Sequence, residues 1–163
     1  MSNIIRFYDY VEVQPLDCYD HLLQSGDFGS RGELIKNIEK IIPVTDLIFA
    51  DLKIPEDSKH KEYTKQSNSL IIDNLKKLSQ LHSNIIIRIP LIPGVNDSKE
   101  DMYKFRQIIA ELKCIKDVEL LKYNYLASSK YRICGMEYND FGNETQSDET
   151  IDTLKQIIRC RDI

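Results

Sequence analysis

The chain has 163 residues, of which 42% are apolar and 29% are charged, and its net charge is −4. This length suits one domain with a hydrophobic core, but a closed (βα) barrel needs about 250 residues. The negative charge gives no field that attracts nucleic acid, so we expect no nucleic-acid partner. The chain has no signal-peptide pattern and no apolar run of transmembrane length, which favours a cytoplasmic protein.

The metal-binding residue types are scattered along the chain. The cysteines are Cys18, Cys114, Cys134 and Cys160, and the histidines are His21, His60 and His82. No two cysteines have the two- or three-residue spacing that brings neighbouring thiolates to one metal. We therefore expect no metal site within this chain and, without an export signal, reduced thiols.

The N-terminal part predicts one strand and one helix. Residues 5–13 place their apolar side chains at alternate positions, which is the period of a strand. Ser30 and Glu33 have the spacing of a capping box, and an apolar stripe of helical period follows them to Ile42. Pro43 then ends the predicted helix.

The rest of the chain continues to alternate strand-like and helix-like segments. The expected strands cover residues 47–50, 84–92 and 118–123, and the expected helices cover residues 70–81, 98–112 and 147–158. Such alternation predicts an α/β fold with a parallel sheet, a partial (βα) barrel of about four βα units. The apolar run 85–87 favours a strand that is covered on both faces. Residues 128–146 have no period, which predicts a long loop.

A partial barrel leaves strand edges without partners. We therefore expect self-association, or a missing N-terminal half, to mask the open edge of the sheet. The alternative is that the strand-like segment Phe7–Val13 pairs with that edge and covers it.

Two polar residues follow the predicted strand 47–50. Asp51 and Lys53 are two residues apart, so their side chains point to the same face. A carboxylate that accepts hydrogen bonds and an ammonium group that donates them suit the vicinal diol of a ribose. The alternative is an ion pair that caps the end of the sheet.

The next strand carries Arg88 among apolar residues. A buried guanidinium needs a carboxylate or a ligand, so Arg88 either contacts a ligand or forms a structural pair, for which Asp51 is a candidate. After this strand, residues 90–97 form a proline-rich loop in which Gly94 permits a positive φ angle. We interpret the loop as a rigid turn between strand and helix.

Three segments, 46–53, 85–97 and 118–124, together resemble the C-terminal half of the activating enzymes of glycyl radical enzymes. These are radical S-adenosylmethionine oxidoreductases typified by pyruvate formate-lyase activase, and the resemblance extends from about Glu39 to the C-terminus. It implies that Asp51 and Lys53 contact the ribose of S-adenosylmethionine and that Arg88 lies beside this cofactor. Asn124 stands where the family typically has a histidine near the adenine. The implied partner is a glycyl radical enzyme.

The family's Cys-x-x-x-Cys-x-x-Cys loop, whose thiolates hold a 4Fe-4S cluster, has no counterpart in this sequence. Without the cluster, reductive cleavage of the cofactor has no electron source. The resemblance therefore implies a truncated or degenerate activase-like domain, inactive alone, with no catalytic residue and with weak cofactor binding at best. A hypothesis of another class is a non-catalytic interaction module that docks a partner at its exposed barrel edge.

Residues from about 7 to 40 instead resemble a segment of the Gram-positive type of DNA polymerase III alpha subunit. The segment has neither a polymerase carboxylate triad nor clustered metal-binding histidines, so it cannot carry that enzyme's chemistry. This resemblance divides the chain into residues 1–42 and 43–163. A third hypothesis is thus a polymerase-derived fragment with an appended half barrel.

Overall fold

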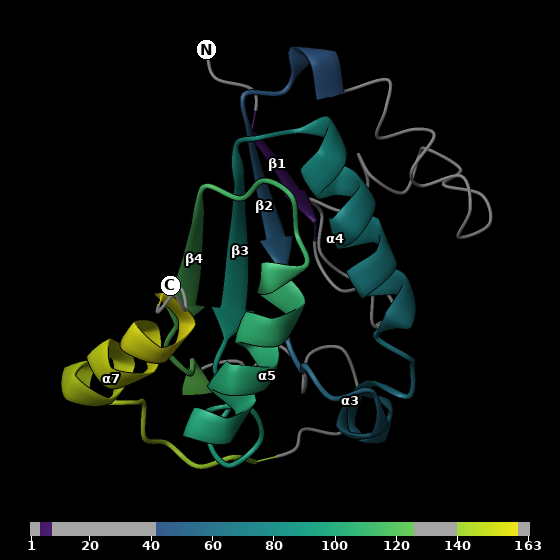
Figure 1. The fold of residues 1–163 in the computed structure, drawn as a ribbon. Helices are drawn as coiled ribbons and strands as arrows, with labels where there is room; N and C mark the ends of the chain where they lie inside the picture. Colours follow the sequence, from purple (N-terminus) through teal and green to yellow (C-terminus); the bar gives the residue numbers. More distant parts are fainter. Residues whose placement is uncertain (1–3, 8–41, 126–139, 160–163) are drawn as a thin grey trace, which may run out of the picture.

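The computed structural model describes residues 4–7, 42–125 and 140–159 (Figure 1). Its four strands are β1 (Ile4–Phe7), β2 (Leu47–Asp51), β3 (Ile85–Pro90) and β4 (Asp117–Leu121). They form one sheet in the order β1-β2-β3-β4, and every neighbouring pair is parallel. The predicted α/β fold with a parallel sheet, a partial (βα) barrel, is confirmed.

Four helices accompany the strands in the described residues, together with the short 3₁₀ turn η1 (Ile42–Val44). They are α3 (Asp57–Thr64), α4 (Ser69–Leu81), α5 (Lys99–Ala110) and α7 (Asp148–Arg159). Figure 1 shows α4 and α5 in front of the sheet and α7 beside β4. None of these helices is long and apolar enough to cross a membrane.

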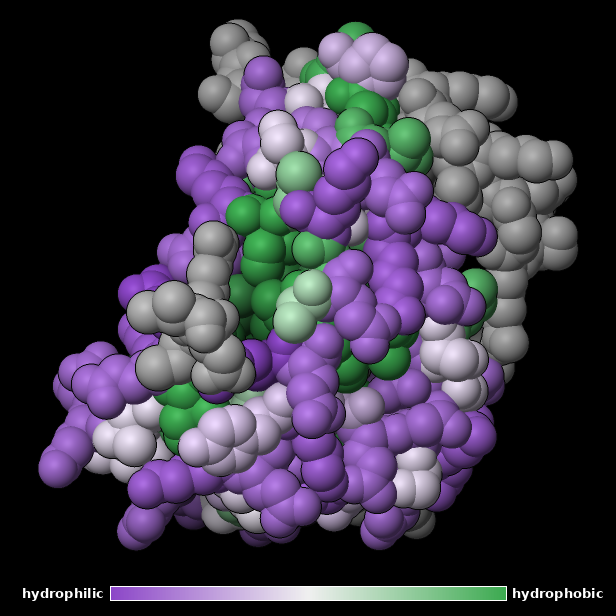
Figure 2. Space-filling view, in the orientation of Figure 1, coloured by the Kyte–Doolittle hydropathy of each residue, from purple (hydrophilic) through white to green (hydrophobic). Residues whose placement is uncertain are grey.

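The hydrophobic core lies between the sheet and the helices. Alternate residues of the strands are buried in it, among them Ile48, Ile87 and Leu120, and the helices contribute side chains such as Phe105 and Leu154. From the helix side the surface is mainly hydrophilic, and apolar residues gather over the sheet beside α5 (Figure 2). The core therefore uses one face of β2, β3 and β4.

The opposite face of the sheet is less well covered. Phe49, Ile86 and Leu121 alternate with the core residues and are only half-buried. Within the described residues, the apolar run 85–87 is thus covered fully on the helix side alone. The expectation that this run is covered on both faces is therefore not met by the described residues. Successive side chains of β3 point to opposite faces, so burial alternates along the three isoleucines.

Several predicted boundaries are confirmed to within a few residues, and the helix starts explain them. Ser98 caps α5: its Oγ accepts a hydrogen bond from the backbone N–H of Asp101 at 3.0 Å, and Asp101 returns one from the N–H of Ser98 at 3.2 Å. Ser147 does the same for α7 by accepting from the N–H of Thr150 at 3.1 Å. The capping signals in the sequence therefore mark real helix starts.

The N-terminal strand pairs with the edge of β2. Ile4 is in register with Leu47 and Phe7 with Ala50, so β1 covers this edge as the alternative hypothesis predicted. The pairing uses residues 4–7, whereas the prediction placed it over Phe7–Val13, most of which lies outside the described residues. The predicted helix that begins at Ser30 and residues 128–139 of the predicted loop also lie outside them.

Helix α7 is held along β4 by an ion pair at each end. Arg159 at the end of the helix lies 3.0 Å from Asp117 at the start of the strand. Lys122, just after the strand, lies 2.8 Å from Asp148 at the start of the helix and lowers the pKa of its carboxyl group. The two exposed ion pairs link α7 to β4 in the antiparallel sense, while the buried Ile151, Leu154 and Ile158 pack the helix on the core.

Candidate functional site

The carboxyl ends of parallel strands lie at one end of a sheet, which is where α/β proteins build their sites. Asp51 is the last residue of β2 and is in register with Arg88 of β3. The N–H of Leu52 donates to the carbonyl oxygen of Arg88 at 2.8 Å, so the pairing of these two chains continues past Asp51. Lys53 follows, and Asn124 stands after the end of β4. Asp51, Lys53 and Asn124 thus lie at or just beyond the ends of β2 and β4, and Arg88 lies within β3, two residues before its end.

Arg88 lies on the half-buried face of the sheet. Its Nε is 3.1 Å from Oε2 of Glu119 on β4, and its guanidinium carbon is 3.9 Å from the centre of the Phe49 ring. The side chains of Arg88 and Glu119 remain 24% and 36% exposed. The guanidinium therefore has a carboxylate partner and an aromatic neighbour, and it is still accessible from solvent.

Sequence reasoning did not name Glu119, although the register makes the pair expected. Glu119 is the β4 residue directly opposite Arg88, and parallel register partners point to the same face. The feature that could have revealed the pair is that a cation on β3 and an anion on β4 point to the same face of the sheet. It could be used only with the strand register, which a single sequence does not give.

The loop after β3 is a compact turn. Gly94 has a φ angle of +71°, as the sequence predicted, and its N–H donates to Oδ1 of Asp97 at 2.9 Å. Asn96 is fully buried, and its Oδ1 accepts a hydrogen bond from the N–H of Ile92 at 2.6 Å. The side chains of Asn96 and Asp97 therefore stabilise the turn by hydrogen bonds to its own backbone.

Residues 140–146 cross the same end of the molecule. The amide of Gln146 accepts from the N–H of Tyr123 at 2.9 Å and donates to Oδ2 of Asp97 at 3.0 Å. The ring of Phe141 packs edge-on against Tyr123, 6.4 Å between centres, and lies 6.1 Å from Tyr63 of α3. These contacts join the segments that follow β2, β3 and β4.

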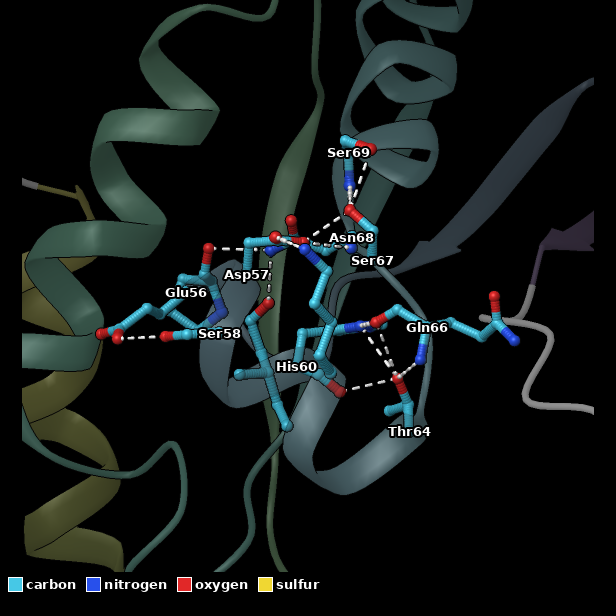
Figure 3. Close-up of polar contacts among 12 residues, drawn as sticks. Glu56, Asp57, Ser58, His60, Thr64, Gln66, Ser67, Asn68 and Ser69 are labelled. Atoms are coloured by element: carbon cyan, nitrogen blue, oxygen red, sulfur yellow. Dashed lines mark hydrogen bonds and ion pairs between the residues drawn. The ribbon is translucent and has the colours of Figure 1, made fainter.

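A polar network fixes the turn between α3 and α4 (Figure 3). Asp57 accepts hydrogen bonds from the hydroxyl of Ser67 at 2.6 Å and from the N–H of Asn68 at 3.0 Å. Hydrogen bonding to Lys61 and to Ser67 lowers the pKa of Asp57 to about 2. In the same turn, Nδ1 of His60 lies 2.7 Å from the carbonyl oxygen of Gln66. The helix α3 was missed because only His60 among its residues is buried, so its sequence has no apolar period.

The predicted site residues are of types that can bind a polyhydroxylated ligand. They combine the carboxylate of Asp51, the ammonium group of Lys53 and the amide of Asn124, which can bind hydroxyl groups and ring nitrogens. An iron–sulfur cluster does not fit the described residues, where no group of three or more Cys, His, Asp or Glu could hold a metal ion. Their single cysteine, Cys114, is exposed on the loop before β4, at the opposite end of the sheet.

The chain is similar to several curated proteins, although no family model matches it. It is 40% identical over 105 residues to the (2S)-3-sulfopropanediol dehydratase activating enzyme of Klebsiella oxytoca, covering 63% of this chain and 33% of the relative. It is 36% identical over 127 residues to the trans-4-hydroxy-L-proline dehydratase activating enzyme of Clostridioides difficile, covering 77% of this chain and 42% of the relative. The pyruvate formate-lyase-activating enzyme of Listeria monocytogenes is 32% identical over 133 residues, which are 82% of this chain and 54% of that protein. The chain therefore spans between a third and about half of the length of these relatives.

Solved structures share the fold. A domain of a pyruvate-formate lyase-activating enzyme from Bacteroides vulgatus ATCC 8482 has a TM-score of 0.62 at 21% identity, over 97% of this chain and 93% of that one. A radical SAM methyltransferase from Sphaerobacter thermophilus has a TM-score of 0.54 at 18% identity, over 77% of this chain and 35% of that one. The polymerase resemblance and the division at residue 42 stay predictions. The curated relatives of this chain are thus activating enzymes of glycyl radical enzymes, and the chain shares a partial (βα) barrel fold with the two solved structures.

Proposed function

We propose that this chain provides the ribose-binding side of an S-adenosylmethionine site of the kind used by activating enzymes of glycyl radical enzymes. The observation that carries the proposal is the register of Asp51, the last residue of β2, with Arg88 within β3, with Lys53 two residues beyond Asp51. The Asp51 carboxylate accepts hydrogen bonds from the two ribose hydroxyls, and the Lys53 ammonium group donates to their oxygens. The homology of the chain supports the same assignment.

Arg88 and Asn124 complete the proposed site. Glu119 and Phe49 hold the guanidinium of Arg88 on the half-buried face, where it adds a positive charge beside the nucleoside. Asn124 follows β4 and is exposed, so its amide is accessible to a ligand. A carboxamide can donate to and accept from the edge of an adenine at the same time. Asn124 therefore takes the adenine side of the site.

The chemistry of the relatives needs a further group, a 4Fe-4S cluster, which the described residues do not fit. With a 4Fe-4S cluster, S-adenosylmethionine supplies the radical that abstracts a glycine hydrogen from the partner enzyme. The residues described above bind and orient the nucleoside, and none of them moves an electron. In this proposal the chain is a truncated or degenerate activase-like domain that is inactive alone.

Titration of the chain with S-adenosylmethionine and with adenosine tests the binding site. We expect weak binding, because the contacts are a few hydrogen bonds worth roughly 1 kcal/mol each. Asp51→Asn should abolish it, since one of the two carboxylate oxygens becomes an NH2 group, which cannot accept from the second ribose hydroxyl. Asp46→Asn, an exposed aspartate at the other end of the same strand, is the matched control and should bind as the unchanged chain does. Unchanged binding in Asp51→Asn would place the ligand elsewhere.

Reconstitution with iron and sulfide under anaerobic conditions tests the claim that the chain is inactive alone. We expect no stoichiometric cluster in the absorption spectrum, because the four cysteines, Cys18, Cys114, Cys134 and Cys160, are too widely spaced in sequence to favour three thiolates at one cluster. One four-iron cluster per chain that survives gel filtration would contradict this part of the proposal.

A second candidate is a non-catalytic interaction module, favoured by the half-buried apolar residues Phe49, Ile86 and Leu121 on the open face of the described sheet. An apolar surface of this kind is typical of a site where a partner protein or a second copy of the chain binds. Light scattering of the chain and of Ile86→Glu separates the two candidates. A dimer that the substitution dissociates would favour the interaction module, and a monomer in both cases would disfavour self-association through this face.

A further inference from the structure

The segment between β2 and α3 is held by two buried asparagine side chains. Nδ2 of Asn96 donates to the carbonyl oxygen of Lys53 at 2.5 Å. Nδ2 of Asn68 donates to the carbonyl oxygens of the next two residues, Ile54 at 3.1 Å and Pro55 at 2.9 Å. Asn96 is 0% exposed and Asn68 is 3% exposed. Three successive carbonyl groups, beginning with that of the proposed ribose contact Lys53, are therefore fixed by side chains from elsewhere in the chain.

Asn96 uses its whole carboxamide to join two loops. Its Nδ2 also donates to the carbonyl oxygen of Pro90 at 2.8 Å, and its Oδ1 accepts from the N–H of Ile92 at 2.6 Å. The backbone ladder between β2 and β3 reaches as far as the hydrogen bond from Leu52 to Arg88. The side chain of Asn96 extends this pairing by one residue, to Lys53, beyond the end of the strands.

The neighbouring residue carries the connection to β4. Oδ2 of Asp97 accepts from the amide of Gln146, and the same amide accepts from the N–H of Tyr123. Tyr123 precedes Asn124, the proposed adenine contact. Hydrogen bonds and the Asn96–Asp97 peptide link thus connect the backbone of Lys53, through Gln146, to the segment that follows β4.

We infer that Asn96 is a positioning residue of the proposed nucleoside site. Its hydrogen bond to the carbonyl oxygen of Lys53 fixes the position of the Lys53 backbone relative to Arg88. Through Asp97 and Gln146 it also connects the end of the site at β2 to the end at β4. The inference rests on the proposed function and adds to it the residue that keeps the ribose and adenine contacts in register. Asn68 holds the same linker from the N-cap of α4, and its hydrogen bonds reach Asp57, Ile54 and Pro55, so its role is confined to the α3–α4 turn.

Asn96→Asp and Asn68→Asp form a matched pair of variants. Each replaces a buried Nδ2 that donates to two carbonyl oxygens by an oxygen that repels them. We expect both to lower the urea midpoint of unfolding by similar amounts. At a temperature where both are folded, Asn96→Asp should weaken S-adenosylmethionine binding by about tenfold, and Asn68→Asp should change it less than twofold. Equal weakening in both, or none in Asn96→Asp, would overturn the inference.

A ligand-free measurement separates this inference from the proposed function. If the unchanged chain binds neither S-adenosylmethionine nor adenosine, the proposed function fails, and amide hydrogen exchange decides the positioning role. Asn96→Asp should raise exchange at Leu52 and Tyr123, whereas Asn68→Asp should leave Tyr123 unchanged. Faster exchange confined to residues 91–97 would show that Asn96 stabilises only its own loop.

A second variant tests the same connection if Asn96→Asp does not fold. Gln146→Met keeps the length of the side chain but removes its donor and its acceptor, and it leaves Asn96 in place. We expect faster exchange at Tyr123 and a several-fold weaker affinity for S-adenosylmethionine. If neither changes, the connection between Lys53 and the end of β4 does not exist.

Discussion

The two faces of the sheet are built from the same strands, one residue apart, and they serve different purposes. On the helix side, Ile48, Ile87 and Leu120 are buried and pack against α4, α5 and α7. On the other side, Arg88 and Glu119 form a half-exposed ion pair among half-buried apolar residues. Stability therefore comes mainly from the first face, since the apolar area removed from water is larger there.

This difference explains how polar groups can be kept beside a hydrophobic core. A guanidinium placed at a position of the helix side would lose its hydration, which costs several kcal/mol even when it is paired. At position 88 it faces away from the core, retains solvent access and lies against an aromatic ring. The face that contributes less to folding is the one free to carry a binding site.

The largest expected effect comes from two neighbouring isoleucines of β3. Ile87→Ala removes a fully buried side chain on the helix side and should lower the free energy of unfolding by 2–5 kcal/mol, measured by urea denaturation. Ile86→Ala, one residue away on the half-buried face, should cost about 1 kcal/mol or less. Equal losses would mean that the second face is covered in solution, either by another copy or by a partner.

A smaller effect should follow from loosening the helix that covers the first face. Ser98→Ala removes the cap of α5 and should destabilise the chain by about 1 kcal/mol. The control is Ser83→Ala, an exposed serine between α4 and β3, which should leave the urea midpoint unchanged. A silent Ser98→Ala would indicate that the packing of Phe105 and Met102 alone holds α5 on the sheet.

Much of this architecture could be predicted from the sequence because it depends on local signals. Apolar residues spaced three and four apart predicted α4. Ser98 and Ser147, as capping residues, predicted where α5 and α7 begin. Asp51 was expected at the end of one strand and Arg88 within the next, and the register brings their backbones side by side. Their proposed roles in binding remain predictions.

What the sequence did not predict depends on contacts between distant segments. Glu119 became visible as the partner of Arg88 only through the register of β3 and β4. Asn96 read as part of a turn, yet its side chain reaches the backbone of Lys53, 43 residues earlier in the chain. Helix α3 has no apolar stripe, since it is stabilised by the polar network around Asp57 and His60. Periodicity cannot detect any of the three.

A still smaller effect is expected on the half-buried face itself. Glu119→Gln leaves Arg88 without its ionic partner, but because both side chains are partly exposed the loss should be about 0–1 kcal/mol. A double-mutant cycle with Arg88→Met measures the coupling directly. A coupling of 3–5 kcal/mol, the value typical of buried pairs, would contradict the exposure of this face and place a covering partner over it.

The smallest effect concerns Asp57, which lies on neither face and whose side chain is 42% exposed. Hydrogen bonds with Lys61 and Ser67 lower its pKa from 3.8 to about 2 in the folded chain. A carboxyl group with a lowered folded pKa adds stability that is fully present above pH 3.8 and is lost as the pH falls towards 2.

Asp57→Asn should therefore make the urea midpoint less dependent on pH across that interval and lower it modestly at neutral pH, where the stability supplied by the ionised carboxylate is lost. The control is Asp152→Asn, an exposed aspartate of α7, which keeps the α3–α4 turn intact. If both variants show the same acid dependence as the unchanged chain, the network around Asp57 does not contribute to folding. The acid sensitivity must then arise elsewhere, for example at Asp148, whose pKa Lys122 also lowers where α7 is held along β4.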